Sequence, residues 1–198
     1  MNPIEVLMNE HRLIESVLDS LEAYVDRLVP NSSVETGDLG LFTQFIRAFA
    51  DTCHHGKEED ILFATMVQHG MPRESGPIAV MLHEHEQGRQ LVRTLADFAA
   101  RPAEPGWSDA DRQRIRQAAR SYAELLRQHI QKEDGILYPM AVSRFDPATM
   151  ADIGRRFDAF EAEKTGPGEH EKLHALAEEL IARYHPSGAT EPHHPHCH

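Results

Sequence analysis

The stretch HHGKEEDILF at residues 54–63 has a close copy, HIQKEDGILY, at residues 129–138. Each copy contains a histidine that is followed four residues later by a glutamate, and these residues are His54, Glu58, His129 and Glu133. In an α-helix, residues four apart lie on one face, about one turn from each other. Each copy therefore predicts a helix that presents an imidazole and a carboxylate on the same side.

The sequence upstream of each copy repeats as well. PIEVLMNEH at residues 3–11 matches PIAVMLHEH at residues 77–85, and the two segments end in His11 and His85. The apolar positions that follow the two histidines also match. The chain is therefore expected to contain two similar helical hairpins, each with one histidine on its first helix and a His-x-x-x-Glu motif on its second.

Apolar residues recur at helical spacing throughout, whereas β-branched residues nowhere alternate with polar ones over a useful length. Asp38 is expected to cap the second helix, and Ser108 with Asp111 resembles a capping box before the fourth. Four long helices joined by short connections predict an all-α, up-down-up-down four-helix bundle. The expected helices cover residues 3–29, 38–68, 77–100 and 109–143.

Two further helices are expected after the bundle. Asp146 and Pro147 can start the first of them, and the glycine- and proline-containing residues 166–168 separate it from the second, which ends near Tyr184. This predicts a bundle domain at residues 1–145, a helical extension packed on it at residues 146–186, and a flexible, histidine-rich tail at residues 187–198.

The composition narrows the functional class. The formal charge of −12 comes with no basic stripe, which argues against binding to nucleic acid or to an anionic membrane surface. No stretch approaches the roughly 18 apolar residues of a membrane span, and the N-terminus lacks the layout of a signal peptide, so a cytoplasmic protein is expected. The two cysteines, Cys53 and Cys197, do not suggest a disulfide, and Cys53 is expected to be an inert buried thiol.

The repeat predicts a metal site in the bundle interior. A single His-x-x-x-Glu pair is common on solvated helix faces, but here the pairs stay in phase with the apolar stripe in both halves, where unpaired carboxylates are costly to bury. Four imidazoles would terminate the two metals and two carboxylates would bridge them, a donor set that suits iron or manganese, with zinc possible. A bridging oxide or hydroxide would supply further negative charge and favours iron. The six predicted ligands are His11, His54, Glu58, His85, His129 and Glu133.

The repeat also separates these ligands from other histidines nearby. His83 aligns with an asparagine and faces another side of its helix, and His55 aligns with an isoleucine, so neither is predicted to be a ligand. Glu59 is expected to accept a hydrogen bond from the N–H of a ligand. His69, at a helix end, is expected to be an ordinary surface residue.

Histidines near the C-terminus lie outside the repeat. His170 and His174 are four residues apart; surface placement is expected, with a separate metal site or a cover over the open end of the bundle as the alternatives. The tail HHPHCH, residues 193–198, can bind a soft or borderline metal ion, or it is a flexible end with adventitious affinity.

The pattern H…HxxxE…H…HxxxE, with the phrases HHGKEEDILF and HIQKEDGILYP, resembles the hemerythrin-like HHE cation-binding family over about residues 3–143. The resemblance implies a non-haem di-iron centre in a four-helix bundle and carries over as iron ligands His11, His54, Glu58, His85, His129 and Glu133.

Two differences separate this sequence from the oxygen carriers of that family. The carriers have a second histidine one turn from the third-helix ligand, where this chain has Met81 and Arg89, and their fourth-helix ligands are a histidine and an aspartate five residues apart. One iron would therefore have one histidine ligand fewer than in the carriers, and more of its coordination positions would be open to water or small ligands. This favours reaction with peroxide, O2 or nitric oxide over reversible O2 carriage. Arg89 and Tyr122 are expected either to line the ligand pocket or to be core-edge residues.

The leading hypothesis is a di-iron protein that binds or reduces one of these small ligands, in oxidative or nitrosative stress or in iron handling. Two alternatives stay open. One is an iron- or gas-sensing module in which the metal state sets the docking of the two C-terminal helices. The other is an iron store or donor, for example for iron–sulfur cluster repair.

Overall fold

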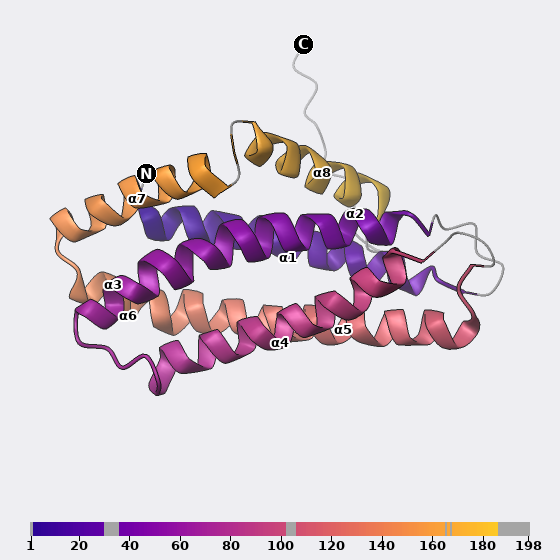
Figure 1. Cartoon of the computed structure of the whole chain (residues 1–198), viewed down its shortest axis with the longest axis horizontal. Coiled ribbons are helices and arrows are strands. Elements are labelled where there is room, and N and C mark those ends of the chain that lie inside the picture. Colours follow the sequence, from indigo (N-terminus) through magenta and orange to yellow (C-terminus); the bar gives the residue numbers. More distant parts are fainter. Residues whose placement is uncertain (1, 30–35, 102–105, 165, 167, 186–198) are drawn as a thin grey trace, which may run out of the picture.

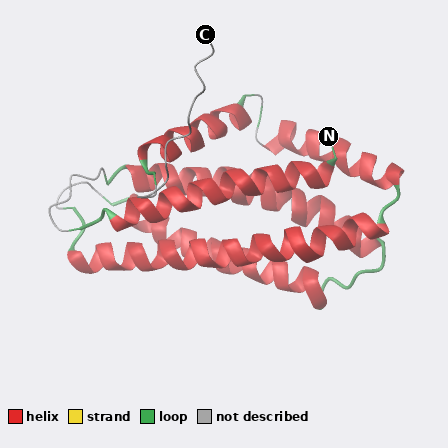
Figure 2. Ribbon diagram, turned by 180° about the vertical axis from the view of Figure 1, so that it is seen from behind, coloured by secondary structure: helices red, strands yellow, loops and turns green. Residues whose placement is uncertain are grey.

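The computed structural model describes residues 2–29, 36–101, 106–164, 166 and 168–185, and in this part of the chain every regular element is a helix (Figures 1 and 2). The first hairpin joins α1 to a long helix made of four consecutive segments, and the second joins α4 to another segmented helix. The bounds are α1 Pro3–Asp26, α2 Asp38–Phe45, η1 Ile46–His55, η2 Glu58–Phe63, α3 Ala64–Gln68, α4 Gly76–Ala99, α5 Asp109–Lys132, η3 Glu133–Leu137, α6 Tyr138–Arg144, α7 Pro147–Lys164 and α8 Glu169–Arg183.

Local sequence signals explain the starts of α1, α5 and α7. The side chain of Asn2 accepts a hydrogen bond from the backbone N–H of Ile4. The predicted capping box is confirmed, because Ser108 and Asp111 exchange side-chain to backbone hydrogen bonds. Asp146 accepts from the backbone N–H of Thr149 at 2.8 Å, as expected of a cap before α7.

The prediction that Asp38 caps its helix is wrong. Asp38 is the first residue of α2, and the N-cap position is taken by Gly37, so no side chain caps this helix. Both oxygens of Asp38 instead accept from Arg183 at 2.6 Å, and one also accepts from the hydroxyl of Tyr184. This buried carboxylate therefore ties the end of α8 to the start of the second long helix.

Both helices with a His-x-x-x-Glu motif contain π-helical turns, where the sequence predicts plain α-helix. Segments η2 and η3 begin at Glu58 and Glu133, which are equivalent positions of the two repeats. π-Helical turns are rare and occur frequently at functional sites. Their occurrence at both glutamates indicates that the surrounding packing sets the backbone there.

The core consists of two apolar clusters separated by a polar layer. The larger cluster includes Leu21, Phe49 and Leu95, and the smaller includes Leu7 and Leu62. On the first three long helices the predicted ligands fall between the residues of one cluster and those of the other; on the fourth, Glu133 does so, while His129 directly precedes Ile130 of the larger cluster. The polar layer is therefore shielded from solvent by apolar packing at both ends.

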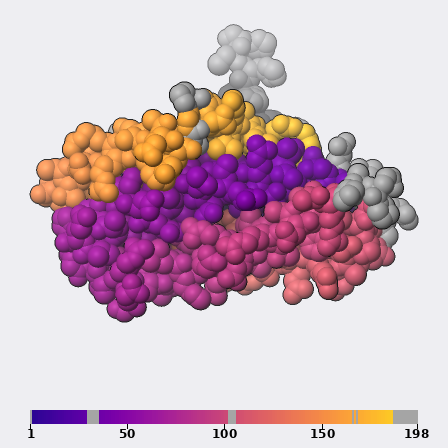
Figure 3. All heavy atoms as spheres, viewed as in Figure 1, coloured from indigo at the N-terminus to yellow at the C-terminus, as the bar shows by residue number. Residues whose placement is uncertain are grey.

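Helices α7 and α8 form an additional layer over α1 and the second long helix, coloured orange to yellow in Figure 3. Phe157 of α7 packs in the smaller cluster and Leu180 of α8 in the larger one. A Cβ added at Gly56 would lie 2.6 Å from the ring of Phe160, so the absence of a side chain at Gly56 lets α7 approach closely.

The proposed division of the chain at residues 145 and 186 stays a prediction. The histidine-rich tail lies outside the described residues. Among the described helices, none is long and apolar enough to cross a lipid bilayer.

Candidate metal centre

All six predicted ligands lie in the polar layer between the two apolar clusters, and none is more than 2% exposed. They come from α1, η1, η2, α4, α5 and η3, so every one of the four long helices contributes at least one side chain. The six residues are His11, His54, Glu58, His85, His129 and Glu133.

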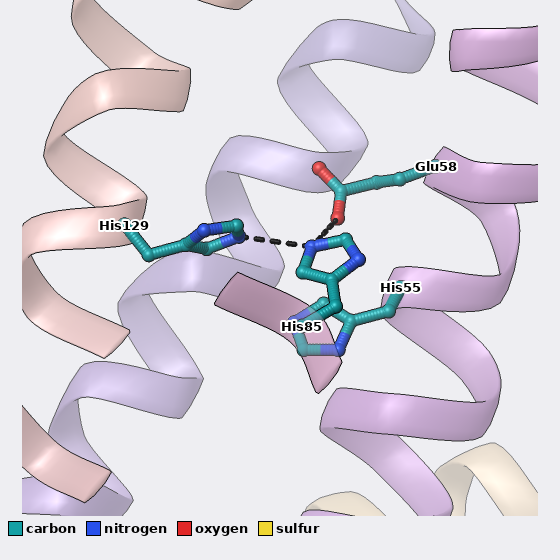
Figure 4. A group of neighbouring side chains, drawn as sticks. All are labelled: His55, Glu58, His85 and His129. Carbon is teal, nitrogen blue, oxygen red and sulfur yellow. Dashed lines mark hydrogen bonds and ion pairs between the residues drawn. The ribbon is translucent and has the colours of Figure 1, made fainter. Parts of the chain in front are cut away.

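The potential ligand atoms form two adjacent groups. In each group the atoms lie within 4.8 Å of one another, and Glu58 belongs to both. Figure 4 shows the second group, in which Glu58 and His129 both point toward His85. The first group is His11, His54, Glu58 and Glu133, and the second is His55, Glu58, His85 and His129.

Each glutamate faces one histidine from each hairpin. Oε2 of Glu58 is 3.7 Å from Nε2 of His54 and 3.5 Å from Nε2 of His85. Oε2 of Glu133 is 3.3 Å from Nε2 of His11 and 3.1 Å from Nε2 of His129. A carboxylate in such a position can bridge two cations, one in each group.

A second carboxylate binds the outward nitrogen of each histidine. The Nδ1–H groups donate over 2.7 to 3.0 Å, so in the neutral imidazole Nε2 carries the lone pair, and every Nε2 faces the centre of the layer. This is the tautomer that a metal ligand needs, and such outer carboxylates also fix the ring orientation. The pairs are His11 with Asp134, His54 with Glu10, His85 with Glu59, and His129 with Glu84.

The predicted acceptor role of Glu59 is confirmed, but the sequence analysis missed the other three carboxylates. Their signal is present in the repeat: Glu10 and Glu84 directly precede the first-helix histidines, and Asp134 follows Glu133 as Glu59 follows Glu58. The four outer contacts thus obey the same twofold relation as the hairpins.

Each outer carboxylate is also paired with a cation. Lys57 contacts Glu10 and Lys132 contacts Glu84, at equivalent positions of the two repeats. Arg12 contacts Asp134, and Nη2 of Arg89 lies 2.6 Å from Oε1 of Glu59. These eight side chains form four acid–base pairs around the four histidines.

The pairing changes the acidity of the outer carboxylates. Burial alone would raise the pKa of Glu59, but hydrogen bonds from His85 and Arg89 lower it to about 2. At Glu10, burial outweighs the nearby ammonium of Lys57 and the pKa is raised.

Tyr138 is a further residue that the sequence analysis missed. Its hydroxyl donates to Oε1 of Glu58 at 2.6 Å, and its ring is parallel to that of His11 with the centroids 5.5 Å apart. Burial, reinforced by the charge of Glu58, raises the pKa of Tyr138 well above its usual value, so the phenol remains a donor. The equivalent residue of the first repeat is Phe63, which has no hydroxyl, so Tyr138 makes the two halves chemically different.

Several buried polar atoms in the layer have no hydrogen-bond partner among the described residues. They include Nε2 of His54, Oε2 of Glu58 and both oxygens of Glu133. An unsatisfied buried polar group costs about 1–3 kcal/mol, and more when it is charged. Nε2 of His85 and Nε2 of His129 also lie only 3.0 Å apart, so two lone pairs face each other unless one accepts a proton. Cations bound to these atoms would relieve both problems, so the residues present fit a pair of metal ions.

The pKa values of the two central carboxylates, Glu58 and Glu133, are shifted in opposite directions. Burial and the neighbouring Glu133 raise the pKa of Glu58 well above its usual value. Burial would do the same to Glu133, but His129 and His11 hold its pKa well below. The layer therefore lacks enough positive charge to keep both carboxylates ionised, which is the condition that divalent cations would correct.

His55 lies closer to the centre than the sequence predicts. Its ring stacks on His85 with the centroids 3.9 Å apart and an interplanar angle of 16° (Figure 4). Ring lone pairs lie in the ring plane, so two nearly parallel rings do not direct their nitrogens at one point. This stacking argues against His55 as a fourth ligand of the second group, although its ligand atom lies within 4.8 Å of those of Glu58, His85 and His129, so its predicted non-ligand role stays a prediction.

A small pocket opens beside the second group. Its volume is about 140 Å³, and its lining includes His85, His129, His55, Arg89 and Tyr122. Arg89 and Tyr122 both line this pocket, and Tyr122 also belongs to the larger apolar cluster, so whether they line the pocket of a ligand stays a prediction.

The other histidines occupy varied positions. His83 is exposed, as predicted, and His69 is exposed with its Nδ1 bound to the carbonyl oxygen of Thr65. His170 and His174 are half-buried and line a second, larger cavity, where surface placement was expected.

Residues 2–141 match the family model described as the hemerythrin HHE cation binding domain. The iron-sulfur cluster repair protein YtfE of Musicola paradisiaca is 33% identical over 109 residues, which cover 52% of this chain and 47% of that protein. YtfE of Salmonella paratyphi B is 29% identical over 104 residues, which cover 51% and 47%. The uncharacterized protein Rv1995 of Mycobacterium tuberculosis is 24% identical over 162 residues, which cover 82% and 62%.

The matched part of the chain thus spans about half the length of the YtfE proteins. No solved structure matches the chain significantly. The family match covers both helical hairpins and all six residues that converge in the buried layer. The chain therefore belongs to the hemerythrin HHE cation binding domain family.

Proposed function

We propose that this protein holds two non-haem iron ions in the buried layer and that the centre reacts with O2, peroxide or nitric oxide. The four long helices would form an up-down-up-down bundle around it. The ligands would be His11, His54, Glu58, His85, His129 and Glu133.

The observation that carries the proposal is the orientation of the four imidazoles. Each Nδ1–H is bound by a carboxylate, so each Nε2 lone pair faces the centre, where three carboxylate oxygens have no hydrogen-bond partner. A structural polar network would satisfy these atoms internally, because unpaired groups at this depth destabilise the fold. Imidazole nitrogen with carboxylate oxygen is a donor set suited to iron.

The small pocket supports a small reactant. A water molecule occupies about 30 Å³ of liquid, so a pocket of about 140 Å³ accommodates a diatomic or peroxidic ligand with a few waters. The pocket reaches His85 and His129 but not His11 or His54. The ligand would therefore approach the second metal position.

Bound iron would supply the electrons for reduction of the ligand. Around it, Tyr138 holds Glu58 by its hydroxyl, and the outer carboxylates hold the imidazoles in one tautomer. Arg89 lines the pocket and is itself fixed by Asp51 and Glu59, at 2.8 Å and 2.6 Å. Its guanidinium lies at the pocket wall with its charge offset by these two carboxylates.

The contacts of Met81 and Arg89 support reactivity over oxygen carriage. Met81 is buried in the smaller apolar cluster, and Arg89 is engaged with two carboxylates, so neither supplies the extra nitrogen found in the carriers. More positions at the second metal would stay open to exogenous ligands. A cytoplasmic location stays a prediction.

Anaerobic loading with ferrous iron tests the proposal. We expect two irons per chain and a change in the near-UV and visible charge-transfer bands when peroxide or O2 is added. Glu133→Gln and His54→Ala should each reduce the iron content, whereas His83→Ala, an exposed histidine, should not. Fewer than two irons in the parent protein, or unchanged bands, would contradict the proposal.

Donation of iron to iron–sulfur clusters is a second candidate, and the similarity to proteins named for iron–sulfur cluster repair favours it. The experiment is transfer of iron from the loaded protein to an apo iron–sulfur protein. Transfer that is faster than release to a chelator would support donation. Transfer at the rate of chelator release, or none, would remove it.

A further inference from the structure

A second cavity lies between the start of α1, α7 and the start of α8. Its volume is about 740 Å³, and it is lined by carboxylates and by two histidines. The family match ends at residue 141, so most of this cavity is built by the two C-terminal helices. The chemically active groups in its wall are Glu10, Asp158, Glu161, His170 and His174.

The two histidines form a pair suited to chelation. His170 and His174 are one helical turn apart on α8, and their ring centroids are separated by 4.6 Å. Both rings lie against the fully buried ring of Phe49, at 5.7 Å and 5.4 Å between centroids. This contact positions both imidazoles at the cavity wall. Histidines four residues apart on a helix can bind one ion together.

The charge of the cavity wall favours a cation. Three carboxylates line the cavity, against the single guanidinium of Arg155. Glu161 is close enough to both Glu10 and His174 that its negative charge acts to raise the pKa of each. Two imidazoles and one carboxylate leave open positions on a divalent transition-metal ion, as in sites that exchange ligands readily.

Lys57 restricts where such an ion can stay. Its ammonium contacts Glu10 and also lies 2.6 Å from Oε1 of Glu161. The group of Glu10, Cys53 and Glu161 has ligand atoms within 4.8 Å, but the ammonium contacts Oε1 of both Glu10 and Glu161, so a cation beside it can bind Glu161 only through Oε2. A cation would therefore be held at the outer side, by the imidazoles.

The cavity is also adjacent to the buried layer. Glu10 lines the cavity with one surface, and its Oε2 accepts from Nδ1 of His54 at 2.8 Å. One side chain thus separates the open cavity from a predicted ligand of the centre. The predicted ligands themselves are at most 2% exposed, so iron needs an entry route through the surrounding helices.

We propose that His170, His174 and Glu161 form a second, open site for one divalent transition-metal ion, and that this site loads iron into the buried centre. Binding at the outer site stands independently of the buried centre, whereas the loading role rests on the proposed function.

Binding is tested by titration with cobalt(II) alone. The tail histidines would compete, so all proteins compared carry His→Ala substitutions at residues 193, 194, 196 and 198. We expect His170→Gln and His174→Gln each to weaken one site at least tenfold and to leave the other sites unchanged. Glu161→Gln should weaken the same site, without removing an imidazole from the contact with Phe49.

The matched control is His69→Gln combined with His83→Gln, which removes two exposed histidines from other parts of the surface. Cobalt binding unchanged in the His170 and His174 variants, or weakened equally in the control, would overturn the outer site. If these histidines only pack against Phe49, the variants should lower the melting temperature without changing the cobalt titration.

Loading is tested by the rate of ferrous iron uptake into the metal-free chain, measured by metal analysis after rapid desalting. We expect uptake to slow at least threefold in a double variant that combines His170→Gln with His174→Gln, with the final iron content unchanged. An unchanged rate would overturn the loading role. A third outcome separates the two proposals. If the parent chain takes up no iron, but the His170 and His174 variants still lose a cobalt site that the parent has, the buried iron centre is refuted and the outer site is retained.

Discussion

The hydroxyl of Tyr138 donates to Oε1 of Glu58 at 2.6 Å, from the start of α6 to the start of η2. The residue that corresponds to Tyr138 in the first hairpin is Phe63. This single hydroxyl therefore holds one of the two central glutamates in place, while the other, Glu133, has no such donor and contacts histidines instead.

Replacing Tyr138 by phenylalanine should destabilise the metal-free protein by about 1–3 kcal/mol, because Oε1 of buried Glu58 loses its donor. Chemical unfolding measures the change. Tyr122→Phe is the control, since no comparable hydrogen bond to a carboxylate holds that hydroxyl, and it should cost less. Equal stabilities of the Tyr138 variant and the parent would show that the hydrogen bond contributes little.

Replacing Glu84 by glutamine should weaken metal binding about 10- to 100-fold, because Nδ1 of His129 loses the charged acceptor that sets its tautomer. Competition between the protein and a chelator for cobalt(II) measures the affinity. Glu86→Gln, an exposed change on the same helix, should have no effect. A similar affinity in both variants would contradict the role given to the outer carboxylates.

Gly56→Ala should destabilise the protein by about 1–3 kcal/mol, because its Cβ would lie 2.6 Å from the ring of Phe160. Thermal unfolding measures the effect of Gly56→Ala in the parent background and in a Phe160→Ala background. In the Phe160→Ala background, Gly56→Ala should cost much less stability, because the clashing ring is gone. Gly135→Ala is the matched control: it is helical and has nothing within 4 Å, so it should be neutral or stabilising by about 0.5–1 kcal/mol. Equal effects of the two glycine changes would refute the close approach of α7.

Lys57→Met should destabilise the protein by about 3–5 kcal/mol, because Glu10 and Glu161 lose their shared partner and one of them is deeply buried. Urea denaturation measures the loss. Lys132→Met, at the equivalent position of the second repeat, should cost less because that side chain is 36% exposed. The two variants would lose equal stability only if the burial of Lys57 were unimportant.

The same ion pairs predict that metal loading alters the protease sensitivity of α7. His54, Glu10, Lys57 and Glu161 form a continuous path of polar contacts from the layer to that helix. A metal on His54 should strengthen its hydrogen bond to Glu10 and so order the path. Limited proteolysis should cleave residues 147–164 more slowly in the metal-loaded protein. Identical digestion patterns would argue against the sensing alternative.

Sequence periodicity predicted much of this structure because the relevant spacings are local. His54 with Glu58 and His129 with Glu133 share a helix face by virtue of four-residue spacing alone, and the capping box at Ser108 depends on three neighbouring residues. The repeat then placed His11 and His85 in the same phase, since both hairpins must bury the same apolar stripe. Helix bounds, the two hairpins and the candidate ligands follow from such short-range relations.

Tertiary structure decided what depends on residues distant in the chain. Asp134 meets His11 across 123 positions, and Asp38 bonds Arg183 rather than its own helix end, because these contacts are created by the way the helices pack. The same packing introduced the π-helical turns at Glu58 and Glu133 and brought Tyr138 over His11. Sequence by itself thus determined which side chains face inward, through the helical period. Only the packed bundle determined which of them meet, because the distance between two helices depends on every side chain that lies between them.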